Sequence, residues 1–485
     1  MSPFQRSRGG CASCKRRKRK CDEARPACAA CRTRGIPCDG YAVQLRWDTE
    51  RSSRGRAATA GTPQCNGSGA ASRPGSAHDE ICTASVDAAG TSLHTLTTST
   101  PNTSSSINHS ASDLDRNTFD RFLEDGVHFL YSTTTYGWIK PLIAQHAERS
   151  PALMAICASI QIYVEQGPSL QHHQHFSRSL QTFQYELAHS NGVLFGPTMG
   201  AGLLVCTLSL LQGLPWTSHL ICMVDLYKLH GGDLRGSLPP ALDAYTHHCL
   251  EVLGIMDMPL FVLGRKTPCL SFWRRFRATQ RLGGDNRNDG GIEPVSGLPR
   301  TLLDIFACSL EEDHDCEGGA ETALWLWCGE EGEFMQLHLW DAWRYAGMLD
   351  YRRRKSIRAE SGISFSDPTT SNGLTLPTTE QLLCRLLASL DALRLGLEMP
   401  ETGHLLVANG IFYPYVNASL EYEILRSRPA WRLSLDRVHD KFLREDKTPN
   451  TQVLLQALHS SWQRGDTSFD PGDAMRSQGV EIALF

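Results

Sequence analysis

The chain has 485 residues and a near-balanced formal charge, with 48 Lys and Arg against 52 Asp and Glu. Residues 1–60 nevertheless carry 15 Lys and Arg against 5 Asp and Glu, whereas the remainder carries 33 against 47. This division, formally +10 and −14, predicts a head that binds a polyanion and a body that does not. The longest apolar stretch, residues 201–211, is too short to cross a bilayer, which excludes an integral membrane protein.

Six cysteines form the first predicted element, a C-x2-C-x6-C half-motif that occurs twice. The six are Cys11, Cys14, Cys21, Cys28, Cys31 and Cys38. Thiolates spaced in this way can converge on a tetrahedral zinc ion. Two such ions need eight ligand positions, so two sulfurs must be shared, and the internal symmetry predicts Cys11 and Cys28 as the bridging pair. No histidine lies within the motif, which excludes zinc sites of the cysteine–histidine type.

Six consecutive cations, residues 15–20, separate the second cysteine from the third. A charge run is usually a solvated face, but here the metal would hold the run on a short helix and fix its side-chain directions. Arg and Lys on such a helix can donate to guanine O6 and N7 in the major groove of DNA. The same run has the composition of a nuclear import signal.

Over residues 11–41 the chain resembles the fungal Zn2Cys6 binuclear-cluster transcription factors. It shares their cysteine spacing, their basic stretch and the proline of the loop between the halves, here Pro26. The resemblance implies two zinc ions per cluster and a first helix that enters the major groove and reads CGG-type triplets. By position, it implies Lys18 as the main base contact, with Arg17 beside it. The implied phosphate contacts are Lys15, Arg16, Arg19, Lys20 and Arg8.

The second helix of the head and the cysteines outside the motif give further expectations, and two alternatives to a DNA-binding zinc cluster are considered. The start of the second helix, near residues 28–31, is expected to offer backbone N–H groups to a phosphate. A disulfide framework is disfavoured by the metal-type spacing, and a purely structural zinc site by the cation run. Outside the motif no C-x2-C pair occurs, and the cysteines in apolar runs, Cys157, Cys206 and Cys222, are expected to be buried reduced thiols.

The composition divides the chain into three parts. Residues 46–112 are rich in Ser, Thr, Ala, Gly and Asn, which predicts a disordered linker. It joins a zinc-cluster DNA-binding domain, residues 1–45, to an all-α regulatory domain, residues 113–485. No heptad repeat follows the cluster, so a coiled-coil dimer is not predicted and a homodimer stays open.

Helical periodicity predicts the elements of the body, and strand alternation is nearly absent. The predicted helices are 118–131, 151–165, 172–189, 199–211, 216–230, 382–397, 417–426 and 450–463. The predicted loops are 281–294, 311–319 and 352–380. The helix order and the W-x2-HL pattern at residues 216–220 are similar to the fungus-specific regulatory domain that follows many Zn2Cys6 clusters. That resemblance, over 115–465, implies effector response and self-association but no particular ligand residue.

Other groups of polar residues in the body do not indicate a particular functional site. The run Gln171 to His175 is interpreted as a polar surface rather than a metal site, since no carboxylate or cysteine is paired with it. The acidic stretch 311–317 is interpreted as a solvated loop, with coactivator binding as the alternative. No nucleophile, metalloprotease or P-loop motif occurs, so an enzyme is not predicted.

These observations predict a zinc-dependent, sequence-specific DNA-binding transcription factor of the RNA polymerase II type, located in the nucleus. Its expected gene set is metabolic or concerned with secondary metabolites, as the resemblance implies. Its partners would be double-stranded DNA and the transcription machinery or a coactivator, with a second copy or a small-molecule effector left open and no membrane. The alternative is an enzyme or a small-molecule receptor in the helical body with a DNA-targeting head.

Overall fold

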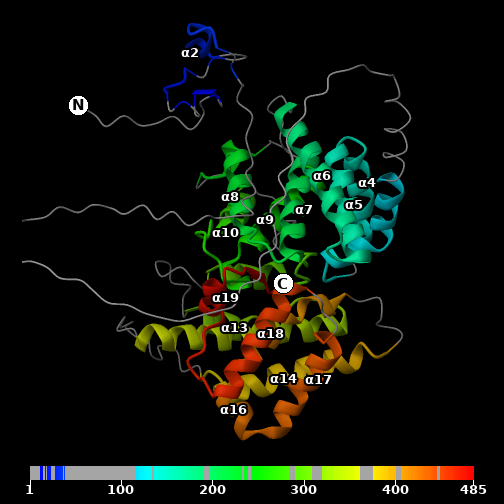
Figure 1. Cartoon of the computed structure of the whole chain (residues 1–485). Coiled ribbons are helices and arrows are strands. Elements are labelled where there is room, and N and C mark those ends of the chain that lie inside the picture. The colour runs from blue at the N-terminus through cyan, green and yellow to red at the C-terminus, as the bar shows by residue number, and fades with distance from the viewer. Residues whose placement is uncertain are drawn as a thin grey trace, which may run out of the picture. The chain divides into compact units, whose positions relative to one another are not determined.

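The structure is a computed structural model of the whole chain (Figure 1). It divides into two compact units, Met1–Ser110 and Ala111–Phe485. In the first unit it describes residues 11, 13–14, 17, 19–22, 24, 28–36 and 38. In the second it describes 115–133, 136–189, 196–231, 234–238, 242–282, 290–308, 319–360, 375–399, 406–444 and 448–485. The predicted linker, 46–112, and the acidic stretch 311–317 lie outside the described residues.

The head is built around sulfur rather than around hydrocarbon. Five of its cysteines are buried, and among the described residues of the head Ala30, Ile36 and Cys38 pack against them. Residues 13 and 14 are helical, and the backbone N–H of Arg17 continues this turn by donating to the Ser13 carbonyl at 3.2 Å. The second helix, α2 (Ala29–Arg32), is followed by a turn at residues 33–35, in which Gly35 has a left-handed φ of +61°. So small a core has little capacity to hold the head together without a metal.

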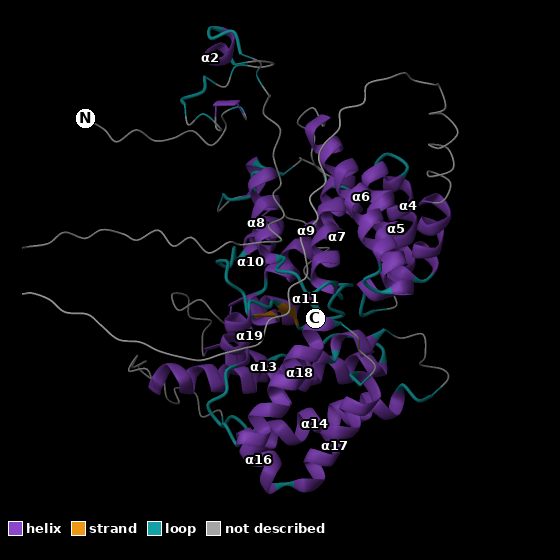
Figure 2. Ribbon diagram, in the orientation of Figure 1, coloured by secondary structure: helices purple, strands orange, loops and turns teal. Residues whose placement is uncertain are grey.

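The body is mostly helical, as predicted (Figure 2). Residues 115–124 are helical, and the elements up to residue 282 are η1 (Gly126–Leu130), α4 (Tyr136–Ala147), α5 (Pro151–Gln166), α6 (Leu170–His189), α7 (Pro197–Leu211), α8 (Thr217–Leu226), η2 (Leu234–Gly236), α9 (Ala244–Asp257), η3 (Pro259–Phe261), β1 (Val262–Leu263) and α10 (Phe272–Leu282). The later elements are α11 (Arg300–Cys308), α12 (Gly319–Leu326), α13 (Phe334–Glu360), α14 (Thr379–Gly396), η6 (Val407–Gly410), α15 (Phe412–Ser419), α16 (Tyr422–Ser427), α17 (Pro429–Phe442), α18 (Pro449–Arg464), α19 (Pro471–Gln478) and β2 (Ile482–Ala483). Among the described residues, no helix is both long enough and apolar enough to span a bilayer.

Two helices with clear start signals confirm the predictions made for them. The α5 helix begins after Ser150, whose hydroxyl accepts a hydrogen bond from the Leu153 N–H while Pro151 takes the first helical position. The α14 helix begins after Thr378, which forms a capping box with Gln381. Each cap satisfies backbone N–H groups that have no partner within the helix. Six of the α14 leucines then pack into the core at helical spacing, namely Leu382, Leu383, Leu386, Leu387, Leu390 and Leu393.

The longest helix, α13, corrects the prediction of a loop over 352–380. It packs against α12, α14 and α15, with Trp340 and Trp343 fully buried on it. Its final turns are rich in Arg and Lys, and for this reason the sequence pattern predicted a polar loop there. Arg352 instead pairs with Glu321 of α12 at 2.5 Å, and Arg353 with Asp350 at 2.7 Å. The helix continues through residue 360, and the residues from 361 to 374 lie outside the described part.

Three other predicted helices are shorter or interrupted. The predicted 118–131 helix is α-helical only to residue 124, and η1 follows it. The predicted 216–230 helix ends at Leu226 as α8, and Lys228 takes a left-handed φ of +58°. The predicted 417–426 helix is in fact the end of α15 and most of α16, separated at residues 420–421. In each case apolar periodicity continues across a turn of the backbone, because side chains on both sides of the turn face the same core.

Residues 481–485 join two distant parts of the body. Strand β2 pairs antiparallel with β1, in the register Val262 with Ala483 and Leu263 with Ile482. The buried Glu481 carboxylate accepts hydrogen bonds from the backbone N–H groups of Trp216 and Thr217 at 2.8 and 2.9 Å. It therefore caps the start of α8 from a position 264 residues further along the chain.

Candidate metal centre and nucleic-acid interface

The six cysteines of the head come together as two overlapping sets of four. The first set is Cys11, Cys14, Cys21 and Cys28, and the second is Cys11, Cys28, Cys31 and Cys38. Within each set the sulfur atoms all lie within 4.8 Å of one another. The two sets share only Cys11 and Cys28, the pair that symmetry predicts as the bridge.

The sulfur–sulfur distances fit tetrahedral zinc and exclude disulfides. The Cys11 Sγ lies 3.6 Å from the Cys28 Sγ and 3.8 Å from the Cys31 Sγ. The Cys14 Sγ lies 3.8 Å from the Cys28 Sγ, its partner in the first set. A zinc–sulfur bond of about 2.3 Å places two sulfurs of one tetrahedron about 3.8 Å apart, whereas a disulfide needs about 2.05 Å. None of the described cysteines is in a disulfide.

Backbone N–H groups form hydrogen bonds to three of the sulfurs and so orient them within the cluster. The N–H groups of Cys14 and Cys31 donate to the sulfurs of Cys11 and Cys28 at 3.4 and 3.3 Å, and the Cys11 N–H donates to Cys21 at 3.3 Å. Desolvation, followed by the neighbouring thiols, raises the pKa of Cys14 to about 12. Desolvation likewise raises the pKa of Cys28 to about 12. A cation among them is what allows such thiols to lose their protons.

The cation run lies only partly within the described residues. Arg17, Arg19 and Lys20 are exposed, as DNA contacts must be. The Arg19 N–H donates to the Cys14 carbonyl at 3.0 Å, which ties the run to the cluster. The other predicted contacts, Lys15, Arg16, Lys18 and Arg8, lie outside the described residues.

Asp22 corrects the expectation that the start of α2 is open to a phosphate. Its two carboxylate oxygens accept hydrogen bonds from the N–H groups of Ala29 and Ala30, both at 2.9 Å. These bonds lower the pKa of the Asp22 carboxyl below its usual value. The next N–H, that of Cys31, is bonded to the Cys28 sulfur. The second half of the cluster is thus capped by a carboxylate from the first half, which takes the place that a phosphate would occupy.

The histidine run on α6 corrects a second expectation, since two of its members are buried rather than on a polar surface. His172 is fully buried and His175 is 5% exposed. The His175 Nε2 lies 2.9 Å from the Asp115 carboxylate and its Nδ1 lies 2.6 Å from the Ser159 hydroxyl. The carboxylate partner was missed because it lies 60 residues away in the sequence.

This Ser159–His175–Asp115 arrangement resembles the order of groups in a hydrolase triad, but its surroundings are those of a structural network. Ser159 is fully buried, and its hydroxyl also donates to the Ala155 carbonyl at 3.0 Å. A nucleophile needs access to substrate and donors for the oxyanion, and a serine bonded to its own helix has neither. The network therefore serves to join residue 115, α5 and α6.

The cysteines of the body are distributed partly as predicted. Cys157 and Cys206 are fully buried, and burial raises the pKa of both thiols far above the ordinary value. Cys222 was expected to be buried with them but is exposed. It lies on α8 at a position where the apolar run continues but the helix face has turned outward.

Comparison with known proteins identifies the head. Residues 9–48 match the family model described as the fungal Zn(2)-Cys(6) binuclear cluster domain. No curated protein and no solved structure matches the chain. The matched segment contains all six clustered cysteines and the whole cation run.

Proposed function

We propose, from the premise that the chain carries a zinc-cluster DNA-binding domain of transcription factors, that it is a nuclear regulator of RNA polymerase II transcription. The head would read guanine-containing triplets of the CGG type, and the body would control the output. The observation that carries this proposal is the pair of four-sulfur sets inside the segment that matches the cluster family. Two zinc ions held there would supply the free energy that folds the head.

The sulfurs have separate roles in this proposal. Cys11 and Cys28 would bridge, since they belong to both sets, while Cys14, Cys21, Cys31 and Cys38 would each hold one ion. Sharing two thiolates lets six ligands complete two tetrahedra. The two halves of the head are then joined by sulfur at one end and by the Asp22 cap of α2 at the other.

The cations divide into base contacts and phosphate contacts. Lys18 would donate to guanine with Arg17 beside it, and Lys15, Arg16, Arg19, Lys20 and Arg8 would neutralise phosphates. Exposure of Arg17, Arg19 and Lys20 supports a role in DNA contact, because each side chain can reach DNA without disturbing the cluster. Since Asp22 occupies the start of α2, phosphate binding falls to these side chains rather than to backbone N–H groups.

The acidic body would act as a regulatory domain of the fungus-specific type, joined to the head by residues 46–112. Its mainly helical fold supports this assignment. The body would regulate a metabolic or secondary-metabolite gene set. It would do so through a coactivator or through a second copy of the chain. Import into the nucleus would use the same run, residues 15–20, before DNA covers it.

Selection of bound sequences from random duplex DNA tests the proposal directly. The full chain is used with zinc and again with a chelator. Zinc-dependent enrichment of CGG-like triplets is expected, and the number and spacing of triplets report whether one or two copies bind. Two bound zinc ions without any enriched sequence would overturn the DNA-reading role.

Substitution of Lys18 separates base reading from phosphate binding. Lys18→Ala should reduce discrimination at one base position by about 1–3 kcal/mol, because a lost base contact affects one sequence more than others. Lys20→Ala is the matched control and should weaken binding to all sequences alike, with a smaller dependence on salt. Affinities for the selected site and for its single-base variants provide the measurement. Equal weakening by Lys18→Ala on every sequence would show that Lys18 does not read a base.

A further inference from the structure

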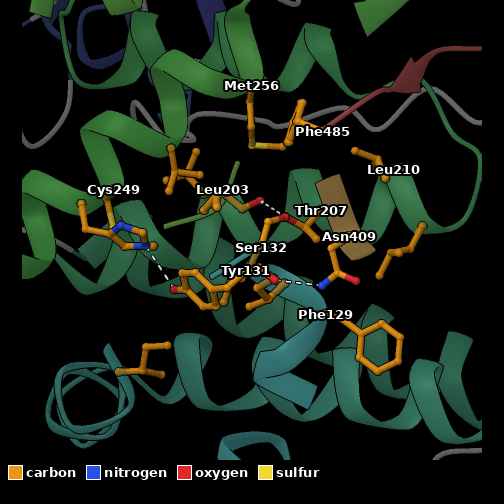
Figure 3. A pocket seen from close by; sticks show the side chains of 18 of the residues that line it. Phe129, Tyr131, Ser132, Leu203, Thr207, Leu210, Cys249, Met256, Asn409 and Phe485 are labelled. Atoms are coloured by element: carbon orange, nitrogen blue, oxygen red, sulfur yellow. Dashed lines mark hydrogen bonds between the residues drawn. The ribbon is translucent and has the colours of Figure 1, made fainter. Parts of the chain in front are cut away.

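The body contains a pocket of about 140 Å³ that lies far from the metal-binding cysteines in the sequence (Figure 3). Helices α7 and α9 form its walls, through residues such as Leu203 and Met256. Tyr131 and Ser132, after η1, and Phe485, after β2, complete the lining. A cavity of about 150 Å³ is large enough for a molecule the size of benzene.

The pocket is lined by uncharged groups. Among the described residues that line it, none is Asp, Glu, Lys or Arg. Its one titratable base, His248, is 5% exposed, and burial lowers the pKa of this histidine to about 4. At neutral pH the side chains of the lining therefore carry no charge, and a charged ligand would lose its hydration without compensation from them.

His248 is one of the polar residues of the lining, beside hydroxyl and amide groups such as those of Thr207 and Asn409. Its Nε2 lies 3.1 Å from the Tyr131 hydroxyl, while its ring packs against Tyr131 and, edge to face, against Trp138. The other ring nitrogen, Nδ1, is buried and has no hydrogen-bond partner among the described residues. In a neutral imidazole one nitrogen donates and the other accepts, so Nδ1 suits one donor or one acceptor.

The walls of the pocket are held by their own contacts. The Asn409 side chain donates to the carbonyls of His128 and Tyr131 at 3.0 and 2.8 Å, which fixes the segment that carries Tyr131. At the opposite wall, Gly200 leaves room for the Tyr245 ring, and a side chain there would overlap the Tyr245 hydroxyl. The pocket is therefore preformed, as small-molecule sites usually are.

We propose that this pocket binds a small uncharged molecule, about one aromatic ring in size, that has a single hydrogen-bonding group facing His248. The proposal does not depend on the DNA-binding role of the head, because none of its residues belongs to the head. It gives the regulatory body a defined ligand class, namely neutral, mainly apolar and compact.

Phenol and benzene are the probes that test it, with the full zinc-loaded chain and titration calorimetry supported by ligand-observed NMR. Saturable binding of both is expected, with phenol about fivefold tighter because one net hydrogen bond is added. Absence of saturable binding of either probe at millimolar concentration would overturn the proposal.

Two pairs of variants locate the binding. Val252→Phe should abolish binding by filling the pocket, whereas Val252→Ala, its matched control, should retain it. Unchanged binding by a folded Val252→Phe protein would place the probes elsewhere and overturn the site. His248→Phe should keep benzene binding and remove the preference for phenol, and a preserved fivefold preference would overturn the role of His248.

Discussion

Cys28 has two structural roles in the head. Its sulfur belongs to both sets of four, and it also caps α2 by accepting the Cys31 N–H at 3.3 Å. Cys38, by contrast, belongs to one set only and is partly exposed. Replacement of Cys28 by serine is therefore expected to cost more bound zinc than replacement of Cys38 by serine.

Cys28→Ser should therefore lose both zinc ions and leave the head unfolded. Cys38→Ser is the comparison, because the set formed by Cys11, Cys14, Cys21 and Cys28 remains complete and should still hold one ion. Zinc released per chain, measured with a chromogenic chelator after dialysis, distinguishes the two. Two ions retained by Cys28→Ser would show that a different cysteine forms the bridge.

The candidate site was more predictable from sequence than the body, for a physical reason. Zinc requires particular ligands at short spacing, so the six cysteines and the symmetric pair Cys11 and Cys28 were evident from local sequence alone. The role of Asp22 was missed, because a side-chain cap depends on how the two halves face each other rather than on spacing. The DNA contacts stay predictions, since Lys18 lies outside the described residues.

At the scale of an element, α6 shows how helical periodicity can be correct and its polar residues misinterpreted. Its buried stripe runs through His172, His175, Ser179 and Phe183, so half of the buried positions carry imidazole. The Gln212 side chain lies 3.1 Å from the His172 Nε2 and provides a polar partner from beyond the helix. Sequence patterns treat histidine as a surface residue, and only tertiary partners show otherwise.

Acid should destabilise the body through such histidines. Burial lowers the pKa of His172, His219 and His248 to about 4, from an ordinary 6.5. Between these values the unfolded chain binds more protons, so the free energy of unfolding falls as pH drops from about 6.5 towards 4. A fully buried histidine with this shift contributes up to about 3 kcal/mol to that loss.

Urea unfolding followed at pH 7 and at pH 5 measures this effect. His172→Phe should reduce the difference between the two midpoints, because one proton-binding group has been removed from the unfolded chain. Gln174→Phe is the control for the added aromatic ring at an exposed position of the same helix and should leave the difference unchanged. An identical pH dependence in His172→Phe and the wild type would contradict the assignment.

At the scale of the whole molecule, periodicity predicted the helical class and part of the helices, but not the connectivity. Apolar stripes located α5, α7 and α14, but no helix was predicted over α4, α9 or the first part of α13. The last turns of α13 were assigned to a loop, because they are rich in cations that form ion pairs. The antiparallel pairing of β1 with β2 was also not predicted, since two residues per strand give no alternation to detect. Contacts between residues far apart in the chain do not appear in a local pattern.

Glu481 should contribute strongly to the stability of the body. Glu481→Gln weakens the charge-assisted hydrogen bonds to Trp216 and Thr217, and a loss of about 2 kcal/mol in the free energy of unfolding is expected. Glu423→Gln changes an exposed carboxylate in the same way and should cost almost nothing. Chemical denaturation of both variants beside the wild type gives the two values. Equal stability of Glu481→Gln and Glu423→Gln would show that the buried cap is dispensable.

The same contact has a consequence for the time course of folding. Bringing Glu481 to the start of α8 closes a loop of 264 residues, and so distant a contact is expected to form after the folding barrier has been crossed. An interaction absent from the transition state changes the unfolding rate rather than the folding rate. Weakening it by about 2 kcal/mol should therefore speed unfolding roughly thirtyfold and leave refolding unaltered. Residues 481–485 thus determine how long the native body lasts, and a protein with this segment displaced would fold at the usual speed but remain folded for a shorter time.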